Sequence, residues 1–463
     1  MNPRRSLAIA AGKMAGALSR RLGKGGGTSL PGLVALAIDP GLLPGLARQV
    51  PQAILVTGTN GKTTTSAMIA SMLRAGGFVP LQNQTGSNLL RGLTTALMAR
   101  CGPGGRLKAV ERSVIIFEVD EAVLPLAASA TRPRTVLFNN LFRDQLDRYG
   151  EVDTVRSLWL KAVGSLPGDT VLVLNADDPA VAGLADAARG TALFFGVEDR
   201  GLGVRGLEHA ADSLRCLKCG DPYEYSASFY AHLGHYRCRG CGSGRPQPQV
   251  TASSVAFDGF EGACFRLEAP QGSSTVSLKL GGLYNVYNAL AAAAAGLALG
   301  LPLNVVAEAL ERFSPAFGRL ERLVIDGRRV CLILVKNPTG FNQVLRALGQ
   351  GPLPDTVMMA LNDRIADGRD VSWIWDVDFD GLEGVRLVVS GLRAEDMALR
   401  LKYGGMAVSK DAVWRDLAGA LDRALESTPE GGTLYVLPTY TAMLELQRLL
   451  ARRGHLQDYW RQK

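Results

Sequence analysis

Ala53-Ile-Leu-Val-Thr-Gly-Thr-Asn-Gly-Lys-Thr-Thr-Thr65 decides the fold of this chain, because a short apolar run leads into a glycine loop that ends in Lys-Thr. This order predicts a strand, a phosphate-binding loop and the start of a helix. Lys62 would reach the terminal phosphates of a nucleotide, and Thr63 would ligate Mg²⁺. The loop is a shortened form, since Val56 stands where the general spacing has a further glycine. The predicted nucleotide-binding residues here are Gly58, Thr59, Asn60, Gly61, Lys62, Thr63 and Thr64.

Length and composition are those of a soluble globular protein with several domains. The chain has 463 residues, of which 47% are hydrophobic and 20% charged. No uncharged apolar run of about 18 residues predicts a membrane span, so any membrane contact would be peripheral. The net charge of +8 favours anionic partners, which include nucleotides, nucleic acids and phospholipid surfaces. Charge alone does not choose among them.

The first residues predict a basic amphipathic helix. Its basic residues are Arg4, Arg5, Lys13, Arg20, Arg21 and Lys24, and its apolar residues are Leu7, Ile9, Ala10, Met14, Leu18 and Leu22. Lys13 interrupts the apolar run and no small-residue cleavage site follows, so we expect a retained helix and not a signal peptide. Two placements stay open: packing on its own domain, or contact with anionic lipid.

Strand and helix patterns alternate after the phosphate loop, which predicts a parallel α/β sheet. Strands are expected at 54–57, 113–118, 135–138 and 170–174, with helices at 64–75 and 154–163. Further strands are expected at 253–267 and 274–278, followed by an alanine-rich helix at 285–299. A second α/β pattern has strands at 330–335, 356–360, 385–389 and 433–436. We therefore expect a helical segment at 1–50, a central domain at 51–321 and a C-terminal Rossmann-like domain at 322–463.

Two cysteine pairs lie in an insertion at about 207–248. The pairs are Cys216 and Cys219, then Cys238 and Cys241, and each is followed by glycine. Four thiolates with this spacing predict a zinc ribbon, and a closed four-sulfur shell predicts a structural role for Zn²⁺. Two disulfides or four free thiols are the weaker alternatives, because we expect a reducing cytoplasm. The segment between the pairs has several aromatic and few basic residues, so we expect no nucleic acid to bind there.

Polar residues follow the predicted strands of the central domain. Glu118 and Asp120 end one strand, and Asn139 follows the next. Ligands of open α/β sheets gather at the carboxyl ends of the strands, so these side chains are expected beside the phosphates. Glu118 or Asp120 would hold Mg²⁺ directly or through water.

These motifs, in this order, resemble the Mur ligase family, ATP-dependent enzymes that join amino acids to peptidoglycan precursors, with folylpolyglutamate synthetase as a relative. The resemblance implies that Glu118 binds Mg²⁺ and that Asn285 and Asn288 serve the adenine and a nearby loop. It also implies that Arg319, after Gly318, reaches the γ-phosphate of ATP. The chain departs from the family at Gln145, where a histidine is usual, and near Trp159, where a carbamoylated lysine is usual, although Lys161 is close.

Three further features are similar to the MurT branch of the family: the four-cysteine insertion, the short segment before the phosphate loop, and the acidic segment 363–376. The resemblance implies that ATP phosphorylates the D-glutamate α-carboxylate of the lipid II stem peptide. Ammonia from a GatD-like glutaminase partner then gives D-isoglutamine. This would occur in the cytoplasm, with peripheral contact at the inner face of the membrane as an open question.

The acidic segment is expected to meet the glutaminase. In the MurT branch an aspartate of the C-terminal domain is thought to complete the partner's Cys-His pair, and the candidates here are Asp370, then Asp367 and Asp363. Two alternatives to the whole interpretation stay open. One is an amino-acid-adding ligase that works alone, and the other is a zinc-ribbon nucleotide-binding protein without catalysis.

Overall fold

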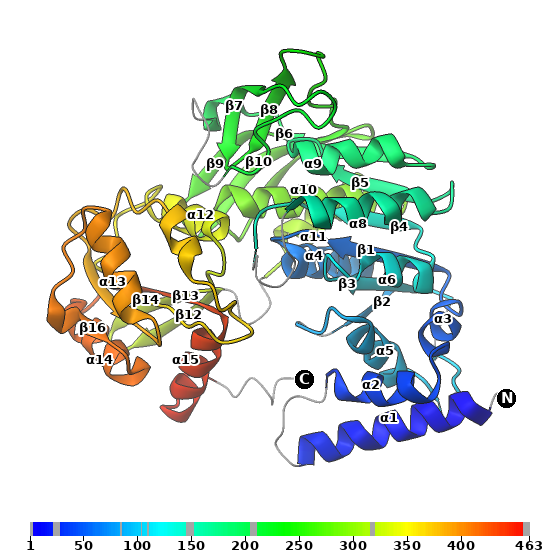
Figure 1. Ribbon diagram of the computed structural model, residues 1–463, viewed down its shortest axis with the longest axis horizontal. Coiled ribbons are helices and arrows are strands. Elements are labelled where there is room, and N and C mark those ends of the chain that lie inside the picture. Colours follow the sequence, from blue (N-terminus) through cyan, green and yellow to red (C-terminus); the bar gives the residue numbers. More distant parts are fainter. Residues whose placement is uncertain are drawn as a thin grey trace.

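The computed structural model describes residues 3–21, 28–83, 86–102, 104–108, 111–144, 152–203, 211–314 and 320–456. Within them the chain forms a large sheet, a smaller second sheet and a two-stranded hairpin (Figure 1). The second sheet lies to one side of the first sheet, and α12 lies between the two sheets (Figure 1). The part of the chain that contains the phosphate loop and the C-terminal part that contains the second sheet are therefore in contact.

The central sheet has the strand order β11-β10-β9-β6-β5-β4-β1-β3-β2. Its strands are β1 (Gln52–Thr57), β2 (Val79–Gln82), β3 (Ser113–Glu118), β4 (Thr135–Phe138), β5 (Val171–Asn175), β6 (Ala192–Val197), β9 (Val250–Asp258), β10 (Gly262–Ala269) and β11 (Gly272–Leu278). β1 lies between β3 and β4 and runs parallel to both. Its carboxyl end is a topological switch point, where open α/β sheets bind their ligands.

Both faces of the central sheet are buried at β1, β3, β4 and β5, which explains why these strands are continuous apolar runs, whereas buried and exposed residues alternate in much of β9, β10 and β11. Alternate residues of β1 enter opposite cores: Ile54 and Val56 enter one, and Ala53 and Leu55 the other. The helices of this part are α2 (Leu30–Ile38), α3 (Leu42–Ala47), α4 (Lys62–Ala75), α5 (Leu90–Ala99), α6 (Leu124–Thr131), α8 (Val152–Ser165), α9 (Pro179–Ala182), α10 (Leu283–Ala298) and α11 (Leu303–Glu311).

The second sheet has the order β12-β13-β17-β14-β15-β16 and is parallel except for the β12–β13 pair. Its strands are β12 (Leu320–Ile325), β13 (Arg328–Ile333), β14 (Thr356–Ala360), β15 (Arg386–Ser390), β16 (Val413–Trp414) and β17 (Thr433–Pro438). The helices are α12 (Pro338–Leu348), α13 (Ala394–Tyr403), α14 (Leu417–Ser427) and α15 (Tyr440–Arg452). Cores on both faces give the Rossmann-like arrangement that the sequence predicts.

One sequence prediction needs correction, and the first helix takes one of the placements left open. The single strand expected at 253–267 is two strands, β9 and β10, because a turn with Gly259 at φ 49° reverses the chain. The first helix, α1 (Pro3–Arg21), packs on α2, but Leu7, Met14 and Leu18 of its expected apolar face are exposed. No helix within the described ranges has the length and apolarity needed to cross a membrane.

Candidate nucleotide and metal sites

The phosphate loop keeps its shape through two glycines in left-handed conformations. Gly58 has φ 135° and Gly61 has φ 85°. A Cβ on Gly61 would lie 2.0 Å from Asn288 Oδ1, and one on Gly58 would lie 2.9 Å from Asn139 Cβ. Any larger residue would push these asparagines away, so both positions require glycine.

The segment after β4 holds the loop from the other side. The backbone N–H of Thr59 donates to Asn140 O at 3.0 Å, and that of Asn60 donates to Asn140 Oδ1 at 2.8 Å. The Thr59 hydroxyl donates to Phe142 O at 3.1 Å. The loop is thus fixed by its own fold before any anion binds.

Lys62 is buried at the start of α4 and faces oxygen atoms. Its Nζ donates to Gly58 O at 2.6 Å and to Glu121 Oε1 at 2.7 Å. Burial opposes the charged form of Lys62, but Glu121 and Glu118 outweigh it and raise the pKa of the ammonium group. Burial also raises the pKa of Glu121, against the attraction of Lys62. The ammonium group of Lys62 is thus held by the Glu121 carboxylate and by the carbonyl oxygen of Gly58.

Thr63 and Glu118 are brought together as the sequence predicts. Thr63 Oγ1 donates to Glu118 Oε2 at 2.8 Å, and both groups lie at the carboxyl edge of the sheet. Asn83 fixes the backbone of Glu118 through hydrogen bonds of 3.0 Å and 2.9 Å. A hydroxyl and a carboxylate oxygen at this spacing suit a hard cation such as Mg²⁺. Asp120 is buried nearby and accepts from the Ala122 N–H.

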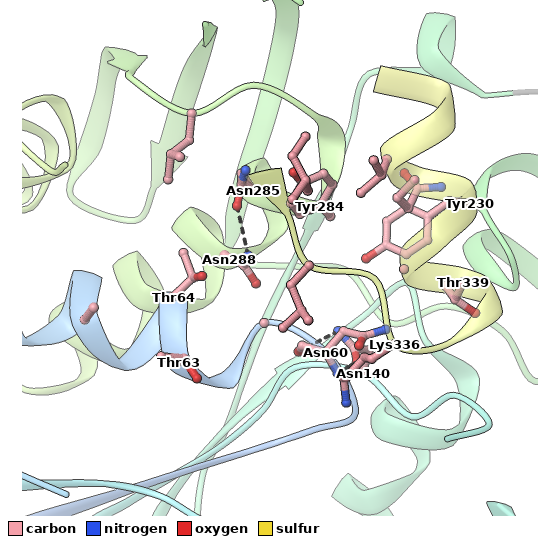
Figure 2. A pocket seen from close by; sticks show the side chains of 18 of the residues that line it. Asn60, Thr63, Thr64, Asn140, Tyr230, Tyr284, Asn285, Asn288, Lys336 and Thr339 are labelled. Atoms are coloured by element: carbon pink, nitrogen blue, oxygen red, sulfur yellow. Dashed lines mark hydrogen bonds between the residues drawn. The ribbon is translucent and has the colours of Figure 1, made fainter. Parts of the chain in front are cut away.

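A cavity of about 140 Å³ opens beside the loop, between α4, α10 and the segment before α12 (Figure 2). Asn60, Thr63 and Thr64 line one side of it. Asn285 and Asn288 face it from α10 and are linked by a 3.2 Å hydrogen bond. The remaining wall is mainly apolar and comes from Ala67, Leu280, Tyr284, Phe313, Ile333, Leu334 and Val344. An apolar wall next to a phosphate loop suits a purine nucleotide.

Lys336 joins the two sheets at this cavity. Its Nζ donates to Thr59 O at 3.2 Å and to Asp144 Oδ2 at 2.5 Å. The neighbouring Asn337 donates to Asn60 Oδ1 at 3.0 Å. The C-terminal part of the chain thereby places a second cation against the phosphate loop. In the sequence, Lys336 directly follows the strand expected at 330–335, and no role was assigned to it.

Lys336 also lines a second cavity, of about 160 Å³, together with Arg143, Asp144 and residues of the segment 363–376. The three candidate aspartates differ there. Asp367 is buried and accepts from Thr441 N at 2.7 Å and from Thr441 Oγ1 at 2.5 Å. Asp363 pairs with Arg393 at 3.1 Å. Asp370 is exposed and accepts from the Ser372 N–H at 2.8 Å, which lowers its pKa.

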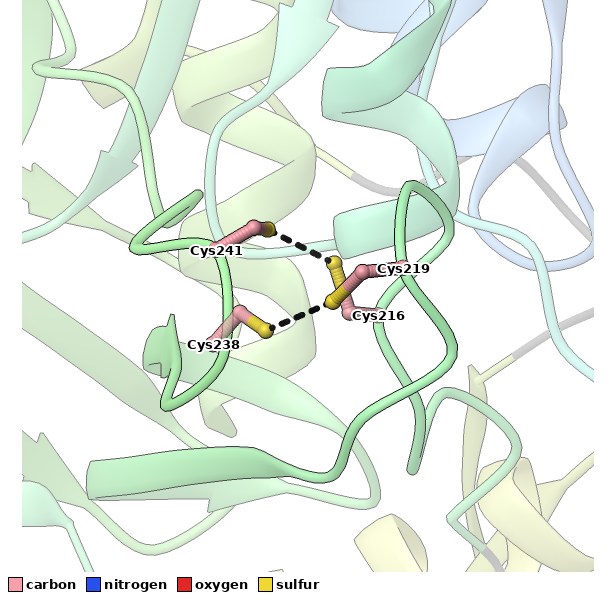
Figure 3. Close-up of side chains that lie close together, drawn as sticks. All are labelled: Cys216, Cys219, Cys238 and Cys241. Carbon is pink, nitrogen blue, oxygen red and sulfur yellow. Dashed lines mark hydrogen bonds between the residues drawn. The ribbon is translucent and has the colours of Figure 1, made fainter.

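The four cysteines converge as the spacing predicts (Figure 3). Their sulfur atoms all lie within 4.8 Å of one another, with Cys216 Sγ 3.6 Å from Cys241 Sγ and Cys219 Sγ 3.3 Å from Cys238 Sγ. Tetrahedral Zn²⁺ with Zn–S bonds near 2.3 Å would separate its sulfurs by about 3.8 Å. The donor set therefore fits zinc. Burial opposes the shift, but backbone N–H groups lower the pKa of Cys216 to about 6, which favours a thiolate ligand.

The hairpin of β7 (Tyr223–Tyr230) and β8 (Leu233–Cys238) links the cysteines to the nucleotide cavity. Tyr230 lines that cavity (Figure 2). Arg346 of α12 donates to Phe229 O and to Leu202 O. The hairpin thus has the cysteines at one end, and its other end contacts α10 through Tyr287 and α12 through Arg346.

Some predicted residues need separate mention. Arg319 lies outside the described residues, so its expected contact with the γ-phosphate stays a prediction. Lys161 is exposed, while Trp159 is buried and donates to Glu121 O at 3.1 Å. Glu121 and Tyr230 were missed as site residues, and Lys336 was left without a role.

Family models match two parts of the chain. The Mur ligase middle domain matches residues 56–229, and the MurT ligase C-terminal domain matches residues 334–443. Among solved structures, MurF from Acinetobacter baumannii superposes with a TM-score of 0.65 at 20% identity, covering 90% of this chain and 80% of that one. This similarity shows the fold.

Two curated proteins are similar over nearly the full length. The lipid II isoglutaminyl synthase (glutamine-hydrolyzing) subunit MurT of Streptococcus pneumoniae strain R6 is 33% identical over 458 residues, covering 98% of each chain. The protein of the same name from Staphylococcus aureus strain COL is 32% identical over 450 residues, covering 96% of this chain and 97% of that one.

Proposed function

This chain belongs to the MurT family of lipid II isoglutaminyl synthase subunits, and from that premise we propose the chemistry of its site. It is the ATP-dependent ligase subunit that amidates lipid II in peptidoglycan synthesis. The group amidated is the D-glutamate α-carboxylate of the stem peptide, and the product is D-isoglutamine. Full-length similarity to two glutamine-hydrolyzing synthase subunits favours this function over a ligase that works alone or a non-catalytic binding protein.

The reaction needs two steps, because a carboxylate is a poor electrophile. A carboxylate oxygen attacks the γ-phosphorus of ATP, and the bond from this phosphorus to the β-phosphate oxygen breaks. ADP departs, and the substrate carries an acyl phosphate. Ammonia then attacks the acyl carbon, loses a proton, and displaces inorganic phosphate. Water would compete with ammonia at the second step, so the intermediate must form where the two parts of the chain close over it.

The residues of the loop divide this work by position. Lys62 neutralises charge on the transferring phosphoryl group, and the Thr63–Glu118 pair would hold Mg²⁺, which supplies further positive charge there. Asn285 and Asn288 orient the adenine side of the nucleotide. Lys336 supplies the cation from the C-terminal side, where Arg319 was the predicted one.

A single observation carries the proposal: the nucleotide cavity and the cavity beside Asp370 share Lys336 as a wall. A carboxylate activated at the phosphate loop would therefore lie next to the segment that a partner can reach. Ammonia released at that segment would have a short path to the acyl phosphate.

The partner is a GatD-like glutaminase, and exposed residues around Asp370 support its docking there. Ile365 is 77% exposed and Trp375 49% exposed, and Trp375 contacts Tyr403, which is 73% exposed. Large apolar side chains that stay in water favour a protein contact. Asp370 would orient the partner's catalytic histidine, because its carboxylate is exposed and accepts a nearby backbone N–H, whereas Asp367 is buried against Thr441 and Asp363 pairs with Arg393.

The cysteine cluster would hold Zn²⁺ in a structural role, because four sulfurs leave no position for water. The enzyme would work in the cytoplasm at the inner face of the membrane, where a lipid-linked substrate is presented.

The test combines the purified chain with a GatD-like glutaminase, ATP, Mg²⁺, glutamine and lipid II, followed by mass spectrometry of the product. The mass change of amidation at D-glutamate is expected only when all components are present. Ammonium salt should replace glutamine and the partner. A chain that hydrolyses ATP without changing the lipid II mass would contradict the proposal.

A further inference from the structure

Helix α1 turns its large apolar residues toward water. Leu7, Met14 and Leu18 are 60%, 66% and 58% exposed. With 3.6 residues per turn, their spacing places them within about 40° of one another on one side of the helix. Ala10 is also exposed on this side. A helix that only covers its own domain would bury these residues.

The opposite side of α1 is built from small residues. Ala8, Gly12, Gly16 and Ser19 are buried there with Ile9. A Cβ on Gly12 would lie 2.7 Å from Pro31 O, and one on Gly16 would lie 2.8 Å from Pro31 Cγ. The glycines let α1 lie close against α2, so the packing of this helix is already complete without Leu7, Met14 and Leu18.

Arginines stand at both ends of the exposed apolar stripe. Arg4 precedes Leu7 by three positions and Arg21 follows Leu18 by three positions, so both residues start on the same side of the helix. The Nε of Arg4 donates to Ile38 O at 2.6 Å, which leaves the exposed Arg21 as the main basic group of this side. No acidic residue occurs in α1. Arg4, Leu7, Ala10, Met14, Leu18 and Arg21 are called the outer face of α1 below.

An apolar stripe with a basic residue at each end matches a helix that lies in the surface of a bilayer. There the apolar side chains enter the boundary between headgroups and acyl chains, and arginines reach anionic phosphates. A protein partner would need a long acidic and apolar groove to match the same face. Beside α1, helix α2 also exposes Leu30 and Leu33 (Figure 1).

We propose that the outer face of α1 binds the surface of membranes that contain anionic phospholipid, and so holds the enzyme where its lipid-linked substrate lies. The benefit to turnover rests on the proposed function. The binding itself does not. The attraction should weaken with salt, because exposed charges are screened within about 8 Å at physiological ionic strength.

The experiment measures co-sedimentation of the full chain, in complex with its glutaminase partner, with vesicles of phosphatidylglycerol and phosphatidylcholine. Phosphatidylcholine vesicles serve as the uncharged probe. The variant Leu7→Gln/Met14→Gln/Leu18→Gln should lose binding by roughly tenfold or more. The matched control Val324→Gln/Leu353→Gln changes exposed apolar residues of the C-terminal part and should bind as the wild type. Arg4→Gln/Arg21→Gln should lose mainly the preference for anionic vesicles.

Amidation of lipid II in detergent is measured in the same samples, which separates this inference from the proposed function. Normal amidation by a wild-type complex that ignores anionic vesicles would overturn the inference and leave the function standing. Loss of the glutaminase from the triple variant would assign the face to a protein. A lower melting temperature of that variant would assign it to the fold. Either result overturns membrane binding.

Discussion

The phosphate loop and the segment 363–376 both place charged groups beside Lys336, but they hold those groups in opposite ways. In the phosphate loop, Lys62 is buried and donates hydrogen bonds to the nearby Gly58 O and to Glu121. In the acidic segment, Asp370 is exposed and its carboxylate accepts a local backbone N–H. The first arrangement is complete within one chain. In the second, the exposed carboxylate is open to contact with another molecule, so substitutions in the two regions should have different effects.

The largest expected effect is at the phosphate loop. Lys62→Ala should abolish amidation with glutamine and with ammonium salt alike, because both routes use the same acyl phosphate. ADP release in the presence of lipid II measures the loss. Since the change also leaves Glu121 buried without its cation, Lys62→Ala/Glu121→Gln is the variant that separates activity from folding. If this double variant folds and still amidates lipid II, the role given to Lys62 at the phosphate loop is wrong.

Asp370→Asn should lower the rate of amidation with glutamine but not the rate with ammonium salt. Glutamine-dependent amidation should fall by about 10³ to 10⁴-fold, the range for loss of a triad carboxylate, while ammonium-dependent amidation stays at the wild-type rate. The matched variant Asp367→Asn should instead lower stability by about 1–3 kcal/mol, because it weakens buried hydrogen bonds with Thr441. If Asp367→Asn shows the split and Asp370→Asn does not, the assignment moves to Asp367.

Lys336→Ala tests the residue that the two regions share, because Lys336 lines both cavities. We expect kcat to fall by about 10²-fold with either nitrogen source while the KM for ATP changes less, since one charge-stabilising donor is removed. Lys336→Arg should restore part of the rate. The exposed Lys161 gives the control Lys161→Ala. An equal loss of rate in that control, or a loss only with glutamine, would show that Lys336 does not serve the phosphoryl group.

The smallest effect is expected from the cysteine cluster. Removal of zinc, or Cys216→Ser, should raise the KM for ATP by about tenfold, because the hairpin positions Phe229 O for Arg346, and such a charge-assisted bond contributes about 1.5 kcal/mol. Cys264→Ser, an exposed cysteine outside the cluster, is the control. An unchanged KM in zinc-free protein would mean that the hairpin does not shape the nucleotide cavity.

The sequence predicted what depends on neighbouring residues. The strand, glycine loop and helix at 52–75 follow from local periodicity and from two positions that only glycine fits. The cysteine spacing likewise predicts the cluster, because both knuckles are short. The asparagines of α10 required a resemblance to a known family, since a helix-start asparagine by itself has many uses.

The parts that were missed depend on distant pairing. Lys336 meets Thr59 across 277 positions, and Glu121 meets Lys62 across 59 positions, so no local pattern reports either contact. The sequence also left open which side of α1 faces the domain, for a related reason. Close packing of Gly12 and Gly16 on Pro31 decides which side is buried, and hydrophobic periodicity alone favours the large residues.

The decisive measurement traces the oxygen atoms of the D-glutamate α-carboxylate into the released phosphate, because the account rests on an acyl phosphate formed from that carboxylate. Lipid II labelled with ¹⁸O in the D-glutamate α-carboxylate is amidated by the chain with its glutaminase, ATP and glutamine, and the released phosphate is weighed. Activation at the phosphate loop predicts that each phosphate carries one labelled oxygen from the carboxylate, because that oxygen bridges carbon and phosphorus in the acyl phosphate. Unlabelled phosphate beside amidated, labelled lipid II would contradict the account.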